Sequence, residues 1–141
     1  MEYVKSFRDL EVYKLSRQLS KDVFETTKKF PKEEMYSLTD QVRRSSRSIG
    51  AQIAEAWAKR KYEKHFVSKL TDSDGEQFET QHWIEMATDC SYISNEVAHD
   101  LLKKCSSIGR MLNSMILKAP QFCPPDKRLN ATENWTPNTG N

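Results

Sequence analysis

Glycine and proline, which interrupt helices and strands most often, are scarce in this sequence of 141 residues. There are four glycines and five prolines, and every proline except Pro31 lies at or after position 120. Residues 1–119 therefore contain little that would break regular structure. This scarcity excludes collagen-like, propeller and most all-β architectures.

Long apolar runs and paired cysteines are also missing. No apolar stretch approaches the roughly 18–20 residues that cross a bilayer, and the first residues, Met1 to Lys5, lack the apolar core of a signal peptide. The three cysteines, Cys90, Cys105 and Cys123, form neither a disulfide framework nor a Cys-x-x-Cys site. We therefore expect a soluble, cytoplasmic protein with free thiols and no membrane partner.

Apolar residues recur every three or four positions and predict four helices. The first covers about 10–30, with Asp9 as its N-cap and Pro31 after it, and the second runs from a capping box at Ser37–Asp40 to about 60. The third begins near Tyr62, becomes polar between 71 and 77, and is apolar again from Phe78. Ser94 caps the fourth, which ends at about 119. The apolar stripes of the first, second and fourth helices are Val12, Leu15, Leu19, Val23, Thr26 and Phe30; Leu38, Val42, Ser45, Ile49, Ile53 and Ala56; and Val97, Leu101, Cys105, Ile108, Leu112, Met115 and Ala119.

Short connections make consecutive helices antiparallel. The predicted fold is all-α: an antiparallel up-down-up-down four-helix bundle over residues 1–119. The Pro-, Asn- and Thr-rich residues 120–141 are expected to form a disordered, flexible C-terminal tail, within which Phe122 or Trp135 could dock locally.

Charge is unevenly distributed along the chain. Residues 1–71 carry a net charge of +6, residues 72–100 carry eight acidic and no basic side chains, and residues 101–118 carry four basic and no acidic ones. Such asymmetry favours either a basic surface for an anionic partner or electrostatic pairing between segments, within one chain or between subunits.

The second helix carries the most specific basic pattern. On a wheel of 100° per residue, Arg43, Arg44 and Arg47 fall opposite the apolar stripe. Trp57 and Tyr62 lie among the basic residues that follow. We predict a nucleic-acid-binding surface made of Arg43, Arg44, Arg47, Lys59, Arg60, Lys61 and Lys64. A solvated face, or one paired with the acidic third helix, explains the same charges.

Three small residues share this outward side of the second helix. Ala51, Ala54 and Ala58 would let another backbone come close, so they predict an oligomer interface. The alternative is that alanine is simply a good exposed helix former.

Two patterns in the sequence also allow an enzyme interpretation. Glu79-x-x-His82 and Glu96-x-x-His99 match the metal-binding pairs of ferritin-like bundles, but the two pairs would lie about 9 Å apart along the helices. Arg60-x4-His65 fits the pattern of HEPN-family RNases, a spacing that also occurs by chance. We therefore predict no catalytic residues, no metal and no cofactor.

Three successive blocks, Phe7–Tyr13, Phe30–Ser45 and Ser48–Ala56, resemble the signature blocks of a bacterial four-helix-bundle family, the 23S rRNA intervening-sequence proteins. Asp74–Glu76, Glu79–Gln81, Trp83 and Met111–Ile116 resemble further blocks of one branch. The resemblance covers about residues 6–123 and departs from much of the family at Gly50 and Ala56.

This resemblance implies a cytoplasmic homo-oligomer, with a ring-like pentamer as the typical form. A related protein is the accessory variability determinant of diversity-generating retroelements, a basic barrel that partners a reverse transcriptase and nucleic acid. Arg43 and Arg44 match the family's paired arginines, and Glu79–Gln81 match a block expected to build polar helix–helix contacts. No enzymatic activity is implied.

The sequence therefore predicts a non-enzymatic homo-oligomer that acts as an adaptor for RNA or for a nucleic-acid-bound protein such as a reverse transcriptase. A purely structural or protein-interaction module, whose basic face pairs with the acidic third helix of a neighbouring subunit, is the first alternative. A ferritin-like metal enzyme or a HEPN-like RNase is the second.

Overall fold

The computed structural model describes residues 4–125, so most of the predicted tail, with Trp135, lies outside the described residues. Within this range four long helices account for most of the chain, and no strand occurs. They are α1 (Glu11–Thr27), α2 (Asp40–Ala58), α3 (Glu63–Asp89) and α4 (Asn95–Leu117). The short helix α5 (Ala119–Phe122) follows α4. The predicted all-α fold with four main helices is therefore confirmed.

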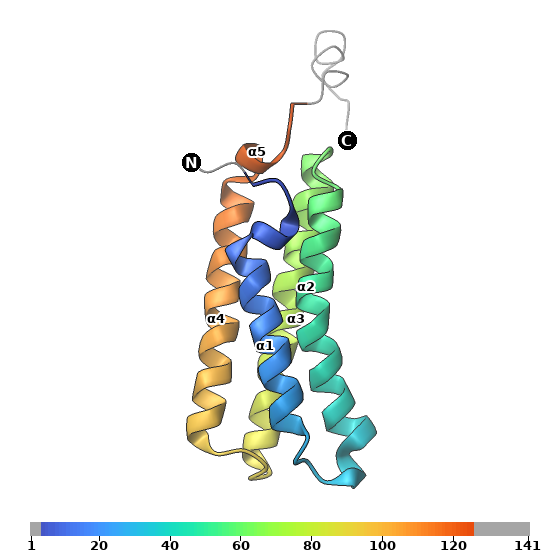
Figure 1. The fold of residues 1–141 in the computed structure, drawn as a ribbon, viewed down its shortest axis with the longest axis vertical. Coiled ribbons are helices and arrows are strands. Elements are labelled where there is room, and N and C mark those ends of the chain that lie inside the picture. Colours follow the sequence, from blue (N-terminus) through green and yellow to red (C-terminus); the bar gives the residue numbers. More distant parts are fainter. Residues whose placement is uncertain (1–3, 126–141) are drawn as a thin grey trace.

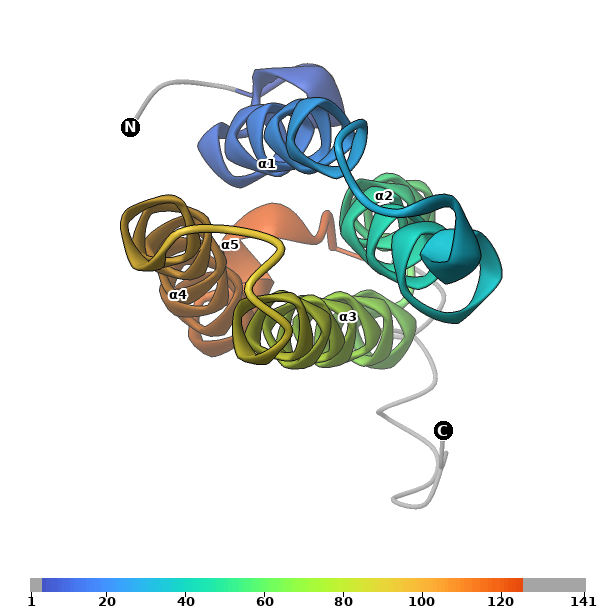
Figure 2. The ribbon, with the colours of Figure 1, turned by 90° about the horizontal axis from the view of Figure 1, so that it is seen from below.

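The four long helices form an up-down-up-down bundle. Figure 1 shows α1 descending, α2 rising, α3 descending and α4 rising, so that the N-terminal segment and α5 lie at the same end. Viewed end-on, the helices surround a central core in the order α1, α2, α3, α4, and α1 closes the ring of helices against α4 (Figure 2). The α1–α2 side and the α3–α4 side are consequently on opposite faces of the bundle.

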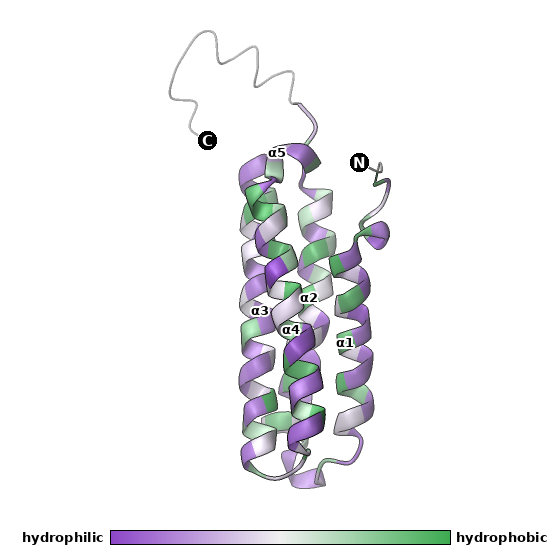
Figure 3. Ribbon diagram, turned by 90° about the vertical axis from the view of Figure 1, so that its left-hand side faces the viewer, coloured by the Kyte–Doolittle hydropathy of each residue, from purple (hydrophilic) through white to green (hydrophobic). Residues whose placement is uncertain are grey.

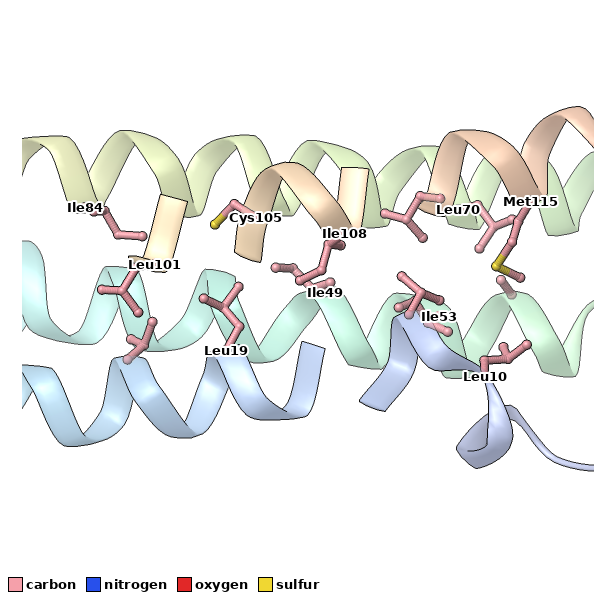
Figure 4. Packing of buried hydrophobic residues seen from close by; sticks show 14 of the residues in the cluster. Leu10, Leu19, Ile49, Ile53, Leu70, Ile84, Leu101, Cys105, Ile108 and Met115 are labelled. Carbon is pink, nitrogen blue, oxygen red and sulfur yellow. The ribbon is translucent and has the colours of Figure 1, made fainter. Parts of the chain in front are cut away.

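The core is a continuous column of apolar side chains between the four helices. Leu19, Ile49, Phe66 and Ile108 are completely buried, and each comes from a different helix (Figure 4 shows three of them). Hydrophobic and hydrophilic positions alternate along each long helix (Figure 3), and most of the buried residues are hydrophobic. Burial of this apolar surface provides the main driving force for folding.

Most predicted core positions are buried, with instructive exceptions. All six residues of the predicted α2 stripe are buried. On α1, however, Ser16 and Thr27 are buried, and neighbouring Leu15 and Thr26 are only half-buried. The α1 helix is thus rotated slightly from its most apolar face, because Ser16 and Thr27 satisfy their hydroxyls by donating to the backbone carbonyls of Tyr13 and Val23.

The helix ends agree only partly with the predicted caps. Ser94 is the N-cap of α4, where its Oγ accepts from the Val97 amide at 3.1 Å. The capping box predicted at Ser37 is wrong: a 3-10 turn (Lys32–Glu34) and a π-helical turn (Met35–Thr39) lead into α2, and Ser37 donates instead to Glu34. Near the N-terminus Asp9 is not the cap of α1 but closes a capping box with Ser6.

The polar stretch in the middle of α3 is continuous helix, and two of its side chains, Ser73 and Gln77, are buried in the bundle. Ser73 Oγ donates to the Ile49 carbonyl at 2.9 Å, and Thr80 Oγ1 lies 2.8 Å from Ser45 Oγ. Gln77, 2% exposed, faces Gly109 of α4, where a Cβ atom would come within 2.9 Å of the Gln77 amide nitrogen. Buried hydrogen bonds therefore replace apolar packing along this part of α3.

One apolar residue of α3 is not used by the bundle. The sequence pattern predicts that the core face resumes at Phe78, but Phe78 is 61% exposed and the core resumes at Ile84 instead. The reason is rotation: Gln77 and Thr80 occupy the inward positions on either side of Phe78, so its ring points outward.

The chain beyond α4 remains packed through α5. The Phe122 ring stacks on buried Phe66 with ring centres 6.0 Å apart, as local docking of Phe122 predicts. Ala119 is buried at the start of this helix. The first residues of the predicted tail thus cover the end of the core at which α3 begins.

Candidate nucleic-acid and assembly surfaces

Two of the predicted nucleic-acid-binding arginines pack toward α1. Arg43 Nε donates to Thr27 Oγ1 at 2.8 Å, and its guanidinium lies 4.7 Å from the centre of the Phe24 ring. The Arg47 guanidinium lies 5.7 Å from the same ring, although the rest of this side chain is exposed. Both contacts are cation–π interactions that hold α2 against α1.

Arg44 turns the other way, toward α3. Its Nη2 lies 2.5 Å from Glu79 Oε2, and its Nη1 lies 3.7 Å from Glu76 Oε1. The Trp83 indole also donates to Glu79 Oε2, at 3.0 Å. Chiefly this indole hydrogen bond, and also the bond from Arg44, hold the pKa of Glu79 below its usual range.

The paired arginines therefore do not form one outward surface. Arg43 is half-buried against α1, and Arg44 is neutralised by the carboxylates of its own chain. Arg44 pairs with carboxylates of α3 in its own chain. This is the pairing between basic and acidic segments within one chain that the uneven charge distribution allows. The Glu79–Gln81 block likewise makes its polar helix–helix contacts inside the chain, through Arg44 and Ser45.

The second basic group lies at the connection between α2 and α3. The Arg60 guanidinium covers the Trp57 ring at 3.8 Å, and Lys61 Nζ lies 5.9 Å from the Tyr62 ring. Lys59, Lys61 and Lys64 are exposed. We call Lys59, Arg60, Lys61 and Lys64 the basic corner. Since α2 rises 1.5 Å per residue, the corner lies about 20 Å from Arg44, so the predicted residues form two separate groups.

The predicted small-residue face forms part of a groove between α1 and α2. This α1–α2 groove has a volume of about 310 Å³ and includes Ala51 and Ala54, whereas Ala58 does not line it. The helices approach closely here, because a Cβ atom on Gly50 would lie 3.0 Å from Ser16 Oγ and 3.4 Å from the Tyr13 ring. The complete lining is Phe7, Tyr13, Ser16, Arg17, Ser20, Arg47, Gly50, Ala51 and Ala54.

Arg17 is a charged residue of this groove that the sequence analysis did not predict. It lies one turn after Tyr13 on α1, and its Nη1 is 3.4 Å from the Tyr13 hydroxyl. The signal was present in the i, i+4 spacing of an aromatic and a basic residue. Its place beside Arg47 depends on how α1 packs on α2, which the periodicity of α1 alone does not specify.

A groove on the opposite side of the bundle carries carboxylates. This groove, of about 390 Å³ between α3 and α4, is lined in part by Glu85, Asp89 and His99. Two grooves of the bundle thus carry charges of opposite sign, with Arg17 and Arg47 in one and these carboxylates in the other.

The residues of the two enzyme interpretations do not converge. Glu79 is engaged by Arg44 and Trp83, and His82, His99 and Glu96 are exposed. Among residues 4–125 no group of three His, Cys, Asp or Glu side chains is arranged to hold a metal ion. His65 is exposed beside Tyr62, with ring centres 5.5 Å apart, while Arg60 covers Trp57.

Comparison with known proteins identifies a family and a similar solved structure. The model of the 23S rRNA-intervening sequence protein family matches residues 8–114. The fold is similar to a crystal structure of a protein of unknown function from the S23 ribosomal protein family of Bacteroides thetaiotaomicron, with a TM-score of 0.68 and 27% identity. The match covers 74% of this chain and 94% of that one. No curated protein matches the chain. None of the helices in the described part of the chain is both long and apolar enough to cross a membrane.

Proposed function

Because the chain belongs to the 23S rRNA-intervening sequence protein family, we propose that it is a cytoplasmic, non-enzymatic homo-oligomer that acts as an adaptor and binds RNA through its basic corner. The observation that carries the proposal is the corner itself, where basic side chains lie among the aromatic residues Trp57 and Tyr62 at one end of the bundle. Arg60 covers Trp57, and exposed Lys59 and Lys61 flank it.

This arrangement suits single-stranded or looped RNA. Lysine and arginine side chains neutralise phosphates and release counterions, which supplies affinity without sequence preference. Unstacked bases pack on aromatic rings and on the flat faces of arginine guanidinium groups. The guanidinium of Arg60 is already held 3.8 Å from the centre of the Trp57 ring, and the exposed ring of Tyr62 lies two residues further along the chain.

The basic corner replaces the arginine pair as the main RNA contact. Arg43 and Arg44 are occupied by Thr27, Phe24 and the α3 carboxylates, so an RNA phosphate would have to compete with these partners. We assign these two arginines to the packing of α2 between α1 and α3. The acidic α3–α4 groove would repel phosphates, which directs RNA to the corner.

The proposal is tested by RNA binding across a salt series. Replacing Lys59 and Lys61 by glutamine removes two charges from the corner, whereas replacing Lys21 and Lys103 removes two exposed charges elsewhere. If both corner lysines contact phosphates, the slope of log K against log salt should flatten by about 1.5 in the corner variant. The Lys21/Lys103 variant should keep the native slope, and particle mass should be the same in all samples.

Two results would refute RNA binding at this corner. One is that the native chain binds neither single-stranded nor structured RNA at low salt. The other is that both double variants lose affinity equally, since that would reflect net charge rather than a site.

A further inference from the structure

Phe78 stands out on the surface of α3. It is a large apolar side chain, 61% exposed, in the middle of the longest helix of the bundle. One turn before it, Gly75 leaves open space, because a Cβ atom placed there would meet nothing within 4 Å. The ring of Phe78 therefore protrudes from the helix next to a position without a side chain. This shape suits insertion of the ring into a groove on another molecule.

The α1–α2 groove has a shape complementary to the protruding ring of Phe78. Its floor consists of small residues, Gly50, Ala51 and Ala54, and Tyr13 supplies an aromatic wall. Its volume is about 310 Å³. A floor without large side chains allows an incoming ring to approach the α2 backbone, and apolar contact with Tyr13 and the alanines would remove that ring from water.

Phe78 lies lower along the bundle than the alanines of the groove. Hydrogen bonds place Thr80 level with Ser45 and Ser73 level with Ile49, so Phe78 lies between these two levels, one turn before Ile49 on α2. Ala51 and Ala54 lie about five to eight residues further along α2, or about 7–12 Å at 1.5 Å per residue. Two parallel copies side by side would therefore need a shift of that size along the bundle to bring the ring of one copy over these alanines of the other.

Charges beside the two features are complementary. Arg17 and Arg47 border the groove, and no carboxylate of residues 4–125 forms an ion pair with either. Glu85 lies two turns after Phe78 on the same exposed side of α3 and likewise has no ion-pair partner in this range. Opposite charges of this kind fix the orientation of a contact more than they add affinity.

We propose that a second copy of this chain occupies the α1–α2 groove, with Phe78 of its α3 seated on Ala51 and Ala54. The inference rests on the homo-oligomer of the proposed function and names its interface. The groove lies between α1 and α2, and Phe78 belongs to α3, which lies across the core from α1 (Figure 2), so the contact joins unlike surfaces and repeats from copy to copy. Contacts between unlike surfaces close into rings when the rotation permits.

Pairwise cross-linking tests this interface directly. In a Cys90→Ser, Cys123→Ser background, one chain carries Phe78→Cys and the other carries Ala51→Cys. Co-expressed chains should form a disulfide between positions 78 and 51, identified by mass spectrometry, whereas neither chain alone should form one between copies. An oligomer that gives no such cross-link would overturn the inference.

Particle mass provides the second arm. Phe78→Ser should reduce the mass to that of smaller species with unchanged helix content, and Ala54→Glu, which fills the groove with a carboxylate, should do the same from the other side. Leu117→Ser, a change of an even more exposed apolar residue on α4, is the matched control and should leave the mass unchanged.

The outcomes separate the inference from the proposal on which it depends. If the native chain is monomeric at every concentration tested, the homo-oligomer and its interface both fail. If the native chain is oligomeric and Phe78→Ser keeps the native mass, only the assigned interface fails. RNA binding by the basic corner is measured independently of either result.

Discussion

Replacing Thr80 by valine removes one hydroxyl group from the buried contact between α2 and α3 and leaves the shape of the side chain almost unchanged. Thr80 Oγ1 donates to the Glu76 carbonyl at 2.9 Å, so Ser45 Oγ, 2.8 Å away, is the donor in the bond between the two hydroxyls. Both residues are completely buried. Without the Thr80 oxygen, the only remaining acceptor for Ser45 is the Val42 carbonyl at 3.3 Å.

The expected cost follows from this asymmetry. Thr80→Val leaves a buried donor with one long hydrogen bond, and we expect a loss of about 1.5 kcal/mol in the free energy of unfolding. Ser45→Ala leaves Thr80 bonded to Glu76 and gains helix propensity, so it should cost about 0.5 kcal/mol. The double variant leaves no unpaired donor and should cost about 1 kcal/mol, which makes the coupling between the two sites about 1 kcal/mol.

The assay is urea unfolding of the native chain, the two single variants and the double variant, followed by circular dichroism. All four are measured at one protein concentration, because self-association would contribute to apparent stability. If the two changes are additive to within about 0.3 kcal/mol, the hydroxyls do not depend on each other and the reasoning about the polar stretch of α3 is wrong.

Three further predictions concern the turn, the ion pair and the thiols. Ser91 has a left-handed φ of 62° between α3 and α4, so Ser91→Gly should stabilise the protein by about 1 kcal/mol and raise Tm by about 3 °C, as a thermal scan would show. The indole of Trp83 lowers the pKa of Glu79, so the stabilisation by Glu79 is present above its unfolded pKa and is lost as pH falls through its folded pKa. Glu79→Gln should therefore be less stable than the native chain at pH 7. Urea titrations should show that this difference in unfolding free energy shrinks toward pH 3. Burial raises the pKa of the Cys105 thiol to about 12, so a thiol reagent at pH 8 should label exposed Cys90 in the folded protein but Cys105 only after urea is added.

The helical architecture was largely predictable because it depends on local rules. An apolar residue every three or four positions predicts an amphipathic helix, and scarce glycine and proline leave such helices uninterrupted. The α2 stripe and most of the α4 stripe are buried as predicted, with Val97 as the exception, since Ala98 is buried in its place. Less predictable were the helix starts, where 3-10 and π-helical turns compete with a simple cap.

The candidate site was predictable in composition but not in arrangement. The sequence indicates that the outward side of α2 carries Arg43, Arg44, Arg47 and three alanines. In the structure, Arg43 packs on α1, Arg44 pairs with α3, and Ala51 and Ala54 line a groove with Arg17. A helical wheel assigns each side chain a direction around its own helix, but it contains no information about which neighbour lies in that direction.

The sequence by itself determined the number of helices, most of the core and the separation of basic from acidic segments, because each follows from periodicity or charge counted along the chain. Only the tertiary structure decided which arginines are neutralised, that Phe78 is left on the surface, and that a groove opens between α1 and α2. These outcomes depend on how each helix is rotated against its neighbours. That rotation is set by the packing of all four helices together and by buried hydrogen bonds between helices such as those of Ser45 and Ser73.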